Sequence, residues 1–392
     1  MRIDDLELYV LHHSYPANDG FAFAGGTATG RVTTLVRVVS DSGLQGWGSA
    51  YTHPGVARAT VVDHLREHLL GADIDDPRAV WAHMHRLTRW YGRAGGAVSS
   101  LGAVDTAIWD LKAQQAGVPL WKLLGGTLSR VPAYASGLLW ADDLEHLRLE
   151  AKRHLQDGFT RVKMRLGRDL DYDLAAVSAV REVVQGPGDI IVDGSLSYDV
   201  DQAARVAELL DDVQALWFEE PFDPAALDRF QELRRRCATP LAAGENETGI
   251  EGFARLVEAD AVDVLQPDAS RVGGVTAVDE VARMATAAGK RIGTHTWSDA
   301  LAVVANAHVV AAHGGITVEI DRTGNPFIDE LLGGLLRVRD GLLDLGESPG
   351  LGVQPDPTVL SALSVDAWPI PGNYSDMAFG AQFASSEHGY GF

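Results

Sequence analysis

Six polar residues recur along the second half of the chain at nearly constant spacing. Successive members lie 23 to 27 residues apart, and each stands at or near the end of a short apolar run, as in LWFEEP at 216–221. A repeat of this length is typical of one strand followed by one helix. The pattern therefore predicts a row of parallel βα units that carry polar side chains at equivalent strand ends: Asp193, Glu219, Glu245, Asp268, His295 and Glu319.

The first three carboxylates predict a metal site. Asp193, Glu219 and Glu245 would come from successive strands and meet on one rim of a barrel. Three anions there would repel one another, and an unpaired buried carboxylate is costly, so we expect a divalent cation to compensate them. Oxygen ligands with open positions for water and substrate favour Mg²⁺ over Zn²⁺. The alternative, that each carboxylate caps a helix or lies in an exposed loop, fits three equally spaced residues poorly.

Asp268 and His295, at the next two strand ends, predict an acid/base pair. A carboxylate beside an imidazole fixes the tautomer of the ring and raises its basicity, which suits a general base or a general acid. His295 is in register with the predicted metal ligands. His308 and His313, on the segment that follows, are expected to be structural.

Lys163 and Arg165 alternate in the apolar stretch RVKMRL and so face the same side of a predicted strand. Inside a barrel they would point at the metal region, where they could bind an anion or move a proton. The alternative is a pair of surface cations. Glu319, on the last strand, could hydrogen-bond to a substrate or orient Lys163, and the sequence leaves both roles open.

The elements that must position these residues follow from hydrophobic periodicity. Beyond about residue 128, eight short apolar runs alternate with seven amphipathic segments, which predicts a parallel barrel with its chemistry at the carboxyl ends of the strands. The residues before about 128 have the pattern of antiparallel strands followed by helices, which predicts an α+β domain. We expect domain boundaries at 1–127, 128–345 and 346–392, with the last segment returning to the first.

Composition narrows the class of protein. The 392 residues are 46% hydrophobic and 22% charged, as in a soluble globular protein. A net charge of −21 disfavours nucleic acid or anionic membranes as partners. One cysteine excludes an intramolecular disulfide framework, and the acidic N-terminal stretch MRIDDLELYV does not read as a signal peptide. A cytoplasmic protein is therefore expected.

The ordered motifs resemble those of a known family. KMR at 163–165, VDG at 192–194, FEEP at 218–221, GEN at 244–246, QPD at 266–268, THT at 294–296 and the final VEID are similar to the enolase superfamily, mandelate racemase subgroup. The stretch AVDTAIWDLKAQQAGVPLWKLLGG resembles the link between the capping domain and the barrel of that family. The resemblance implies an α/β fold: a modified TIM barrel, (β/α)7β, with an α+β capping domain formed by the N-terminal segment and the C-terminal tail.

The resemblance also implies a mechanism, in which the proton α to a carboxylate is abstracted and the enediolate is held by Mg²⁺. Asp193, Glu219 and Glu245 would bind the metal, and His295 with Asp268 would be one acid/base. Lys163 would bind or polarise the substrate carboxylate, and Glu319 would hydrogen-bond to it.

Arg165 departs from the family pattern, because the subgroup usually has a lysine base there. Arginine stays protonated in proteins, so two-base racemisation is in doubt and a substrate-binding role is expected instead.

These observations lead to two main hypotheses about the activity. The first is a lyase, a Mg²⁺-dependent dehydratase that converts a sugar acid to a 2-keto-3-deoxy acid. The second is an isomerase, either a racemase or a cycloisomerase, because EIDRTGNPF at 319–327 resembles some sugar-acid cycloisomerases. A non-catalytic barrel would lack the acid/base pair, and an aldolase would leave the carboxylate series unexplained.

Substrate specificity is expected to come from loops of the capping domain. Residues 13–30, which include Tyr15 and Phe21 among glycines, and residues 51–55 should line the distal pocket. The substrate would be a small carboxylate. The family resemblance further suggests a homo-oligomer.

Overall fold

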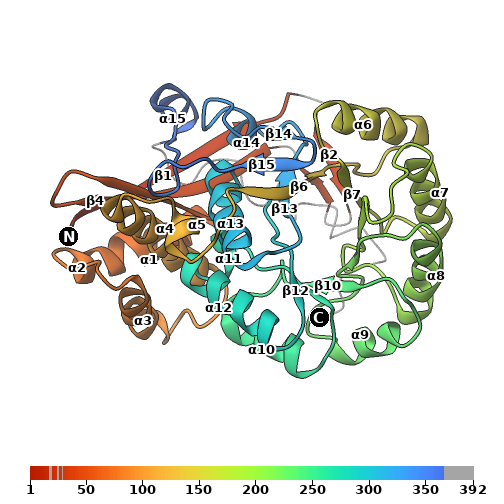
Figure 1. The fold of residues 1–392 in the computed structure, drawn as a ribbon, viewed down its shortest axis with the longest axis horizontal. Coiled ribbons are helices and arrows are strands. Elements are labelled where there is room, and N and C mark those ends of the chain that lie inside the picture. The colour runs from red at the N-terminus through yellow and green to blue at the C-terminus, as the bar shows by residue number, and fades with distance from the viewer. Residues whose placement is uncertain (17–19, 24–25, 29, 366–392) are drawn as a thin grey trace.

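The computed structural model describes residues 1–16, 20–23, 26–28 and 30–365. The described chain forms two parts that lie side by side (Figure 1). The N-terminal strands and helices lie on one side, and a ring of helices surrounds short strands on the other. The aromatic stretch beyond residue 365, which was expected to pack on the N-terminal part, lies outside the described residues.

The N-terminal part is built on a three-stranded antiparallel sheet. β4 (Gly30–Ser40) lies in the middle, between β1 (Ile3–Ser14) and β5 (Gln45–Ala50). This agrees with the predicted antiparallel strands. The loop predicted to line the distal pocket, residues 13–30, contains a short hairpin, β2 (Phe21–Phe23) with β3 (Gly26–Ala28).

Helices cover this sheet, and α4 (Gly96–Ala116) makes the closest contact. A Cβ atom on Gly46 or Gly48 of β5 would lie 2.0 Å from a carbonyl oxygen of α4, so the contact requires glycine at both positions. α4 is capped at its C-terminus by Gly117, whose φ of 68° is the left-handed conformation that glycine adopts readily. The other helices are α1 (Pro54–Thr60), the π-helix η1 (Val61–Leu65), α2 (Arg66–Leu69), α3 (Pro77–Thr88) and α5 (Leu120–Leu123).

The second part contains the eight predicted parallel strands in chain order. They are β6 (Arg130–Ser136), β7 (Arg161–Arg165), β8 (Ile190–Asp193), β9 (Phe218–Glu219), β10 (Leu241–Ala243), β11 (Val264–Leu265), β12 (Arg291–Ile292) and β13 (Val318–Asp321). β13 pairs with β6, and a single parallel bridge between Thr294 and Val318 links the end of β12 to β13. This bridge brings the chain just beyond β12 beside β13.

Seven helical connections join the eight strands, as predicted. They are α6 (Leu144–Gln156), α7 (Leu170–Arg181), α8 (Val200–Asp212), α9 (Leu227–Arg234), α10 (Ile250–Glu258), the pair α11 (Ala269–Val272) and α12 (Gly274–Ala287), and α13 (Ala300–His313). Among the described residues, no helix has the length and apolar character that a membrane span requires.

A second hairpin follows the barrel. β14 (Val338–Arg339) and β15 (Leu342–Asp344) come after the short helix α14 (Pro326–Asp329), and β15 pairs antiparallel with β6. The sequence analysis did not predict this hairpin. After α15 (Pro357–Leu363) the chain reaches β1, where Ser364 forms an antiparallel bridge with Leu11.

The inside of the barrel is filled by side chains rather than hollow. One buried cluster joins residues from five neighbouring or facing strands: Tyr134, Ile191, Trp217, Ala242 and Val264. Successive residues of a strand point to opposite faces, so Trp217 and Glu219 both point inward. The apolar layer therefore supports a polar layer at the carboxyl ends of the strands.

Candidate active site

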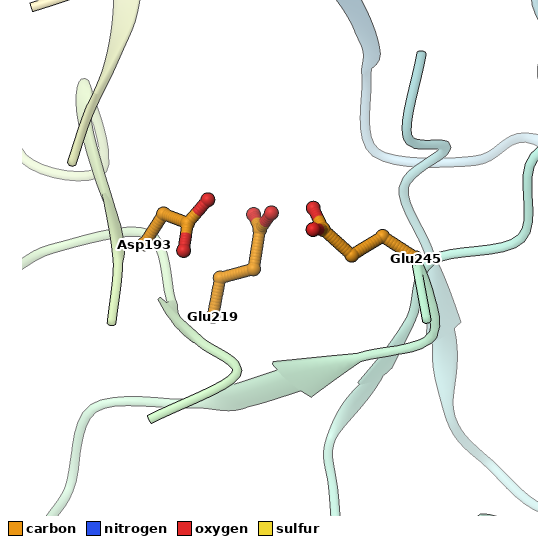
Figure 2. Close-up of side chains that lie close together, drawn as sticks. All are labelled: Asp193, Glu219 and Glu245. Carbon is orange, nitrogen blue, oxygen red and sulfur yellow. The ribbon is translucent and has the colours of Figure 1, made fainter. Parts of the chain in front are cut away.

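The three predicted metal ligands converge at the carboxyl ends of β8, β9 and β10. Asp193 ends β8 beside Glu219 at the end of β9, and Glu245 stands two residues beyond β10. Their carboxylates point toward a common centre (Figure 2). One oxygen from each lies within 4.8 Å of the chosen oxygens of the other two. Parallel pairing places equivalent strand ends side by side, which explains the convergence.

Lys163 and Arg165 extend from β7 into this carboxylate group. Lys163 Nζ lies 2.8 Å from Glu219 Oε1 and 2.6 Å from Glu319 Oε1, and Arg165 forms an ion pair with Asp193. Both side chains are buried, so the alternative of two surface cations is wrong. Burial alone would lower the pKa of Lys163, but the charges of Glu219 and Glu319 outweigh it and raise that pKa.

Negative charge exceeds positive charge in this group. Five carboxylates face the cations of Lys163 and Arg165 and the imidazole of His295. Even with the imidazole protonated, two negative charges remain in excess. The carboxylates belong to Asp193, Glu219, Glu245, Asp268 and Glu319. Among the described residues, the buried Glu245 Oε2 has no hydrogen-bond partner, although His295 Nε2 lies 3.4 Å away. The oxygen-only ligand set, the excess charge and the unpaired oxygen all fit Mg²⁺.

Glu220 stabilises the turn next to the metal site, a role that the sequence analysis missed. It is buried and accepts hydrogen bonds from Gly244 N at 2.8 Å and Asn246 Nδ2 at 2.6 Å. These bonds hold the turn that carries Glu245. Burial, followed by the nearby Glu245 charge, raises the pKa of Glu220 to about 8. Its φ of 33° lies in the left-handed region, which is unusual for a residue other than glycine.

His295 and Asp268 form the predicted pair. His295 Nδ1 lies 3.0 Å from Asp268 Oδ2, and Asp268 Oδ1 accepts hydrogen bonds from Ser270 and Asn306. Because an ionised carboxylate only accepts, Nδ1 carries the proton and Nε2 faces the carboxylate group. Burial alone would lower the pKa of His295, but the neighbouring carboxylates, Glu245 foremost, raise it to about 9.

A cluster of two arginines and aromatic rings joins the N-terminal part to the rim of the barrel. The guanidinium carbons of Arg165 and Arg31 lie 4.6 and 4.7 Å from the centroid of the Trp297 ring. Arg31 also pairs with Asp321 at 2.9 Å. The sequence analysis identified neither Arg31 nor Trp297, although Trp297 directly follows the motif THT.

Tyr15 and Phe21, the predicted pocket residues, lie in this same cluster. Tyr15 accepts a hydrogen bond from Arg31 Nε at 2.7 Å, and its ring packs edge-on against Phe21. Phe21 in turn lies edge-on to Trp297, with ring centroids 6.2 Å apart. The described part of the predicted pocket loop, residues 13–30, is thus attached to the barrel through Arg31 and Trp297.

The two histidines of α13 are structural, as expected. His308 Nδ1 accepts a hydrogen bond from Trp121 N at 3.0 Å, and Nε2 donates to Leu351 O at 3.1 Å. Burial lowers the pKa of His308 to about 4, so the ring is neutral at pH 7. His313 pairs with Asp279 at 2.7 Å, away from the carboxylate group.

Comparison with known protein families matches both parts of the chain. The mandelate racemase / muconate lactonizing enzyme N-terminal domain matches residues 5–125, and the enolase C-terminal domain-like family matches residues 146–359.

Curated relatives include enzymes of two reaction types. The chain is 35% identical over 339 residues to 3,6-anhydro-alpha-L-galactonate cycloisomerase of Streptomyces coelicolor, covering 84% of this chain and 91% of the relative. It is 30% identical to D-galactarolactone cycloisomerase of Agrobacterium fabrum, covering 90% and 96%. It is 28% identical to arabinonate dehydratase of Saccharolobus solfataricus, covering 89% and 96%.

Solved structures agree with these matches. The 3,6-anhydro-D-galactonate cycloisomerase from Zobellia galactanivorans has a TM-score of 0.85 at 31% identity, covering 93% of this chain and 100% of the other. A racemase from Streptomyces coelicolor with bound magnesium has a TM-score of 0.83 at 29% identity, with the same coverage.

Proposed function

Because the chain belongs to the mandelate racemase / muconate lactonizing enzyme family of the enolase superfamily, we propose that it is a Mg²⁺-dependent dehydratase of a sugar acid. The enzyme abstracts the proton α to the substrate carboxylate, and the resulting enediolate loses its β-hydroxyl as water. The observation that carries this proposal is the position of His295 Nε2, which faces the three-carboxylate group while Nδ1 is held by Asp268.

We assign the metal to Asp193, Glu219 and Glu245. Mg²⁺ held there supplies positive charge that stabilises the enediolate oxygens. Lys163 lies within the same carboxylate group and adds a second positive charge for the substrate carboxylate. Glu319 contacts Lys163 at 2.6 Å and accepts a hydrogen bond from Thr296 N at 3.0 Å, so it orients this lysine and faces the substrate.

His295 performs the proton transfers. Its Nε2 accepts the α-proton while the electron pair of the C–H bond moves into the enediolate. The same imidazolium then returns that proton to the β-hydroxyl as the C–O bond breaks, and water leaves. Asp268 stabilises the imidazolium between the two steps. One residue on one face of the substrate is sufficient for these two proton transfers.

Arg165 binds the substrate rather than acting as a base. Its pKa is raised because the charge of Asp193 and nearby carboxylates outweighs the effect of burial, so it stays protonated. Its Nε atom is buried and without a hydrogen-bond partner among the described residues, which leaves a donor for a substrate oxygen. A permanent cation at this position disfavours two-base racemisation.

A cycloisomerase is the second candidate, because two of the relatives named above carry that activity. Both candidates begin with α-proton abstraction by His295. They differ in the leaving group, because an anhydro or lactone oxygen stays attached to the product when its ring opens.

A library of sugar acids, their lactones and their anhydro forms distinguishes the two candidates. We expect 2-keto acid formation from an open-chain acid, with the mass of one water lost. Product of unchanged mass from a cyclic acid alone would favour the cycloisomerase. Absence of Mg²⁺-dependent turnover with every compound would contradict both.

The pocket residues, domain boundaries, location and assembly of the protein are also proposed. Tyr15 and Phe21 border the distal end of the pocket, because Phe21 lies against Trp297 beside Arg165 and Tyr15 packs on Phe21. We propose the boundaries 1–127, 128–345 and 346–392 for the capping domain, the barrel and the returning tail.

A cytoplasmic location agrees with the single cysteine. The family resemblance suggests a homo-oligomer, which sedimentation would test by a species larger than 42.0 kDa.

A further inference from the structure

Glu219 differs from the other two proposed metal ligands in how its oxygens are occupied. Its Oε2 accepts hydrogen bonds from Trp217 Nε1 at 3.0 Å and from Gln266 Nε2 at 2.7 Å. Its Oε1 accepts from Lys163 Nζ at 2.8 Å. A carboxylate oxygen has two lone-pair sites, so Oε2 is fully used and Oε1 keeps one site free.

The two donors approach Glu219 from fixed positions. Trp217 directly precedes β9, is fully buried in the apolar layer of the barrel edge-on to Tyr134, and points the same way as Glu219 two residues later. A Cβ atom on Gly293 would lie 3.0 Å from the indole, so the glycine makes room for the ring. Gln266 is also fully buried, directly after β11.

Burial of the Gln266 amide reduces the stability of the fold. Among the described residues, its buried Oε1 has no hydrogen-bond partner. An unsatisfied buried acceptor destabilises a fold by about 1–3 kcal/mol, whereas an apolar side chain of the same shape avoids that cost. Stability alone therefore does not account for glutamine here, and the contact that it makes is to a proposed metal ligand.

We propose that Trp217 and Gln266 are positioning residues that restrict Glu219 to one-oxygen ligation and thereby select Mg²⁺ over Ca²⁺. The inference rests on the proposed metal site. Mg²⁺ requires near-octahedral geometry with short bonds, whereas Ca²⁺ accepts more oxygens and often binds both oxygens of a carboxylate. Two-oxygen ligation by Glu219 would require Oε2 to give up one of its two hydrogen bonds, both of which are made to the ionised carboxylate.

The test measures metal binding directly, without a substrate. Calorimetric titration with Mg²⁺ and with Ca²⁺ is compared for the wild type, Gln266→Met and Trp217→Phe. Methionine keeps the length of glutamine and phenylalanine keeps an aromatic ring, but both lose the N–H donor. Gln114→Met is the matched control, because Gln114 Nε2 donates to the buried carboxylate of Asp110 at 2.9 Å, outside the site.

We expect Mg²⁺ affinity to fall by about 10- to 100-fold in Gln266→Met, as for other supporting contacts of metal ligands, while Ca²⁺ affinity changes less. Thermal stability should not fall, which separates positioning from a structural role. An unchanged ratio of the two affinities in both variants would overturn the proposal, as would the same shift in Gln114→Met. Mg²⁺ binding that is unaffected by Glu219→Gln would overturn the metal assignment itself.

Discussion

Arg31→Met should loosen the attachment of the predicted pocket loop, residues 13–30, to the barrel and destabilise the protein measurably. Arg31 and Asp321 form an ion pair at 2.9 Å whose side chains are 4% and 0% exposed. Removing one partner of a buried pair costs about 3–5 kcal/mol, because the remaining charge is uncompensated. Asp321 still accepts hydrogen bonds from Thr323 and Asn325, so we expect the lower end of that range.

The expected shift in melting temperature follows from chain length. With about 2.1 cal/mol/K of unfolding entropy per residue, 392 residues give roughly 0.8 kcal/mol/K. A loss of about 3 kcal/mol then lowers the melting temperature by roughly 4 °C. Calorimetry of the purified variant measures this shift, and Arg31→Met with Asp321→Asn should recover most of it because the unpaired charge is gone.

Arg148→Met is the control, because Arg148 pairs with Glu182 at 2.7 Å where the carboxylate is 62% exposed. Exposed pairs contribute about 0–1 kcal/mol, so its melting temperature should change by about 1 °C or less. Equal shifts in the Arg31 and Arg148 variants would refute the reasoning that burial makes the Arg31 contact important.

Chelation should abolish turnover and added Mg²⁺ should restore it, whereas Glu219→Gln should stay inactive at saturating Mg²⁺; a fully active Glu219→Gln enzyme would contradict the ligand assignment. Arg165→Lys should mainly raise KM, because lysine keeps the charge but loses the planar donors, and kinetics on the best library substrate measure this. The free energy of unfolding should decrease as the pH is lowered from 6.5 to about 4. His308 has a pKa of about 4 in the folded state and about 6.5 in the unfolded state. The unfolded state therefore binds more protons in that pH range, and acid favours unfolding. The loss is on the order of 3 kcal/mol, and urea unfolding of the wild type and His308→Gln at pH 7 and pH 5 tests whether this histidine is its source.

The carboxylate group was predictable because its geometry is periodic. Parallel strands of equal repeat length bring their ends together, so the spacing of Asp193, Glu219 and Glu245 was sufficient to place them on one rim. The alternation of strand side chains likewise placed Lys163 and Arg165 on one side. Glu220 was missed, although the same alternation implies that it points away from Glu219.

Contacts between distant segments were not predictable in this way. Arg31 and Trp297 belong to different parts of the fold, and no local pattern links positions 31 and 297. The hydrogen bond from Gln266 to Glu219 joins neighbouring parts of the barrel but depends on side-chain conformation rather than on spacing. The hairpin β14–β15 was missed because its short strands lie outside the strand–helix repeat that located the equally short β9, β11 and β12.

Exchange of the substrate α-hydrogen in D₂O is the most direct test of the proposed chemistry. A sugar acid that the wild type converts is incubated with His295→Asn and with Lys163→Ala, and deuterium uptake is followed by NMR. We expect His295→Asn to lose both exchange and turnover, because the only imidazole aimed at the carboxylate group among the described residues is gone, at a cost of about 10²- to 10⁴-fold. Exchange that persists in His295→Asn and disappears in Lys163→Ala would show that the proton leaves from the other face, and the assignment of His295 would be wrong.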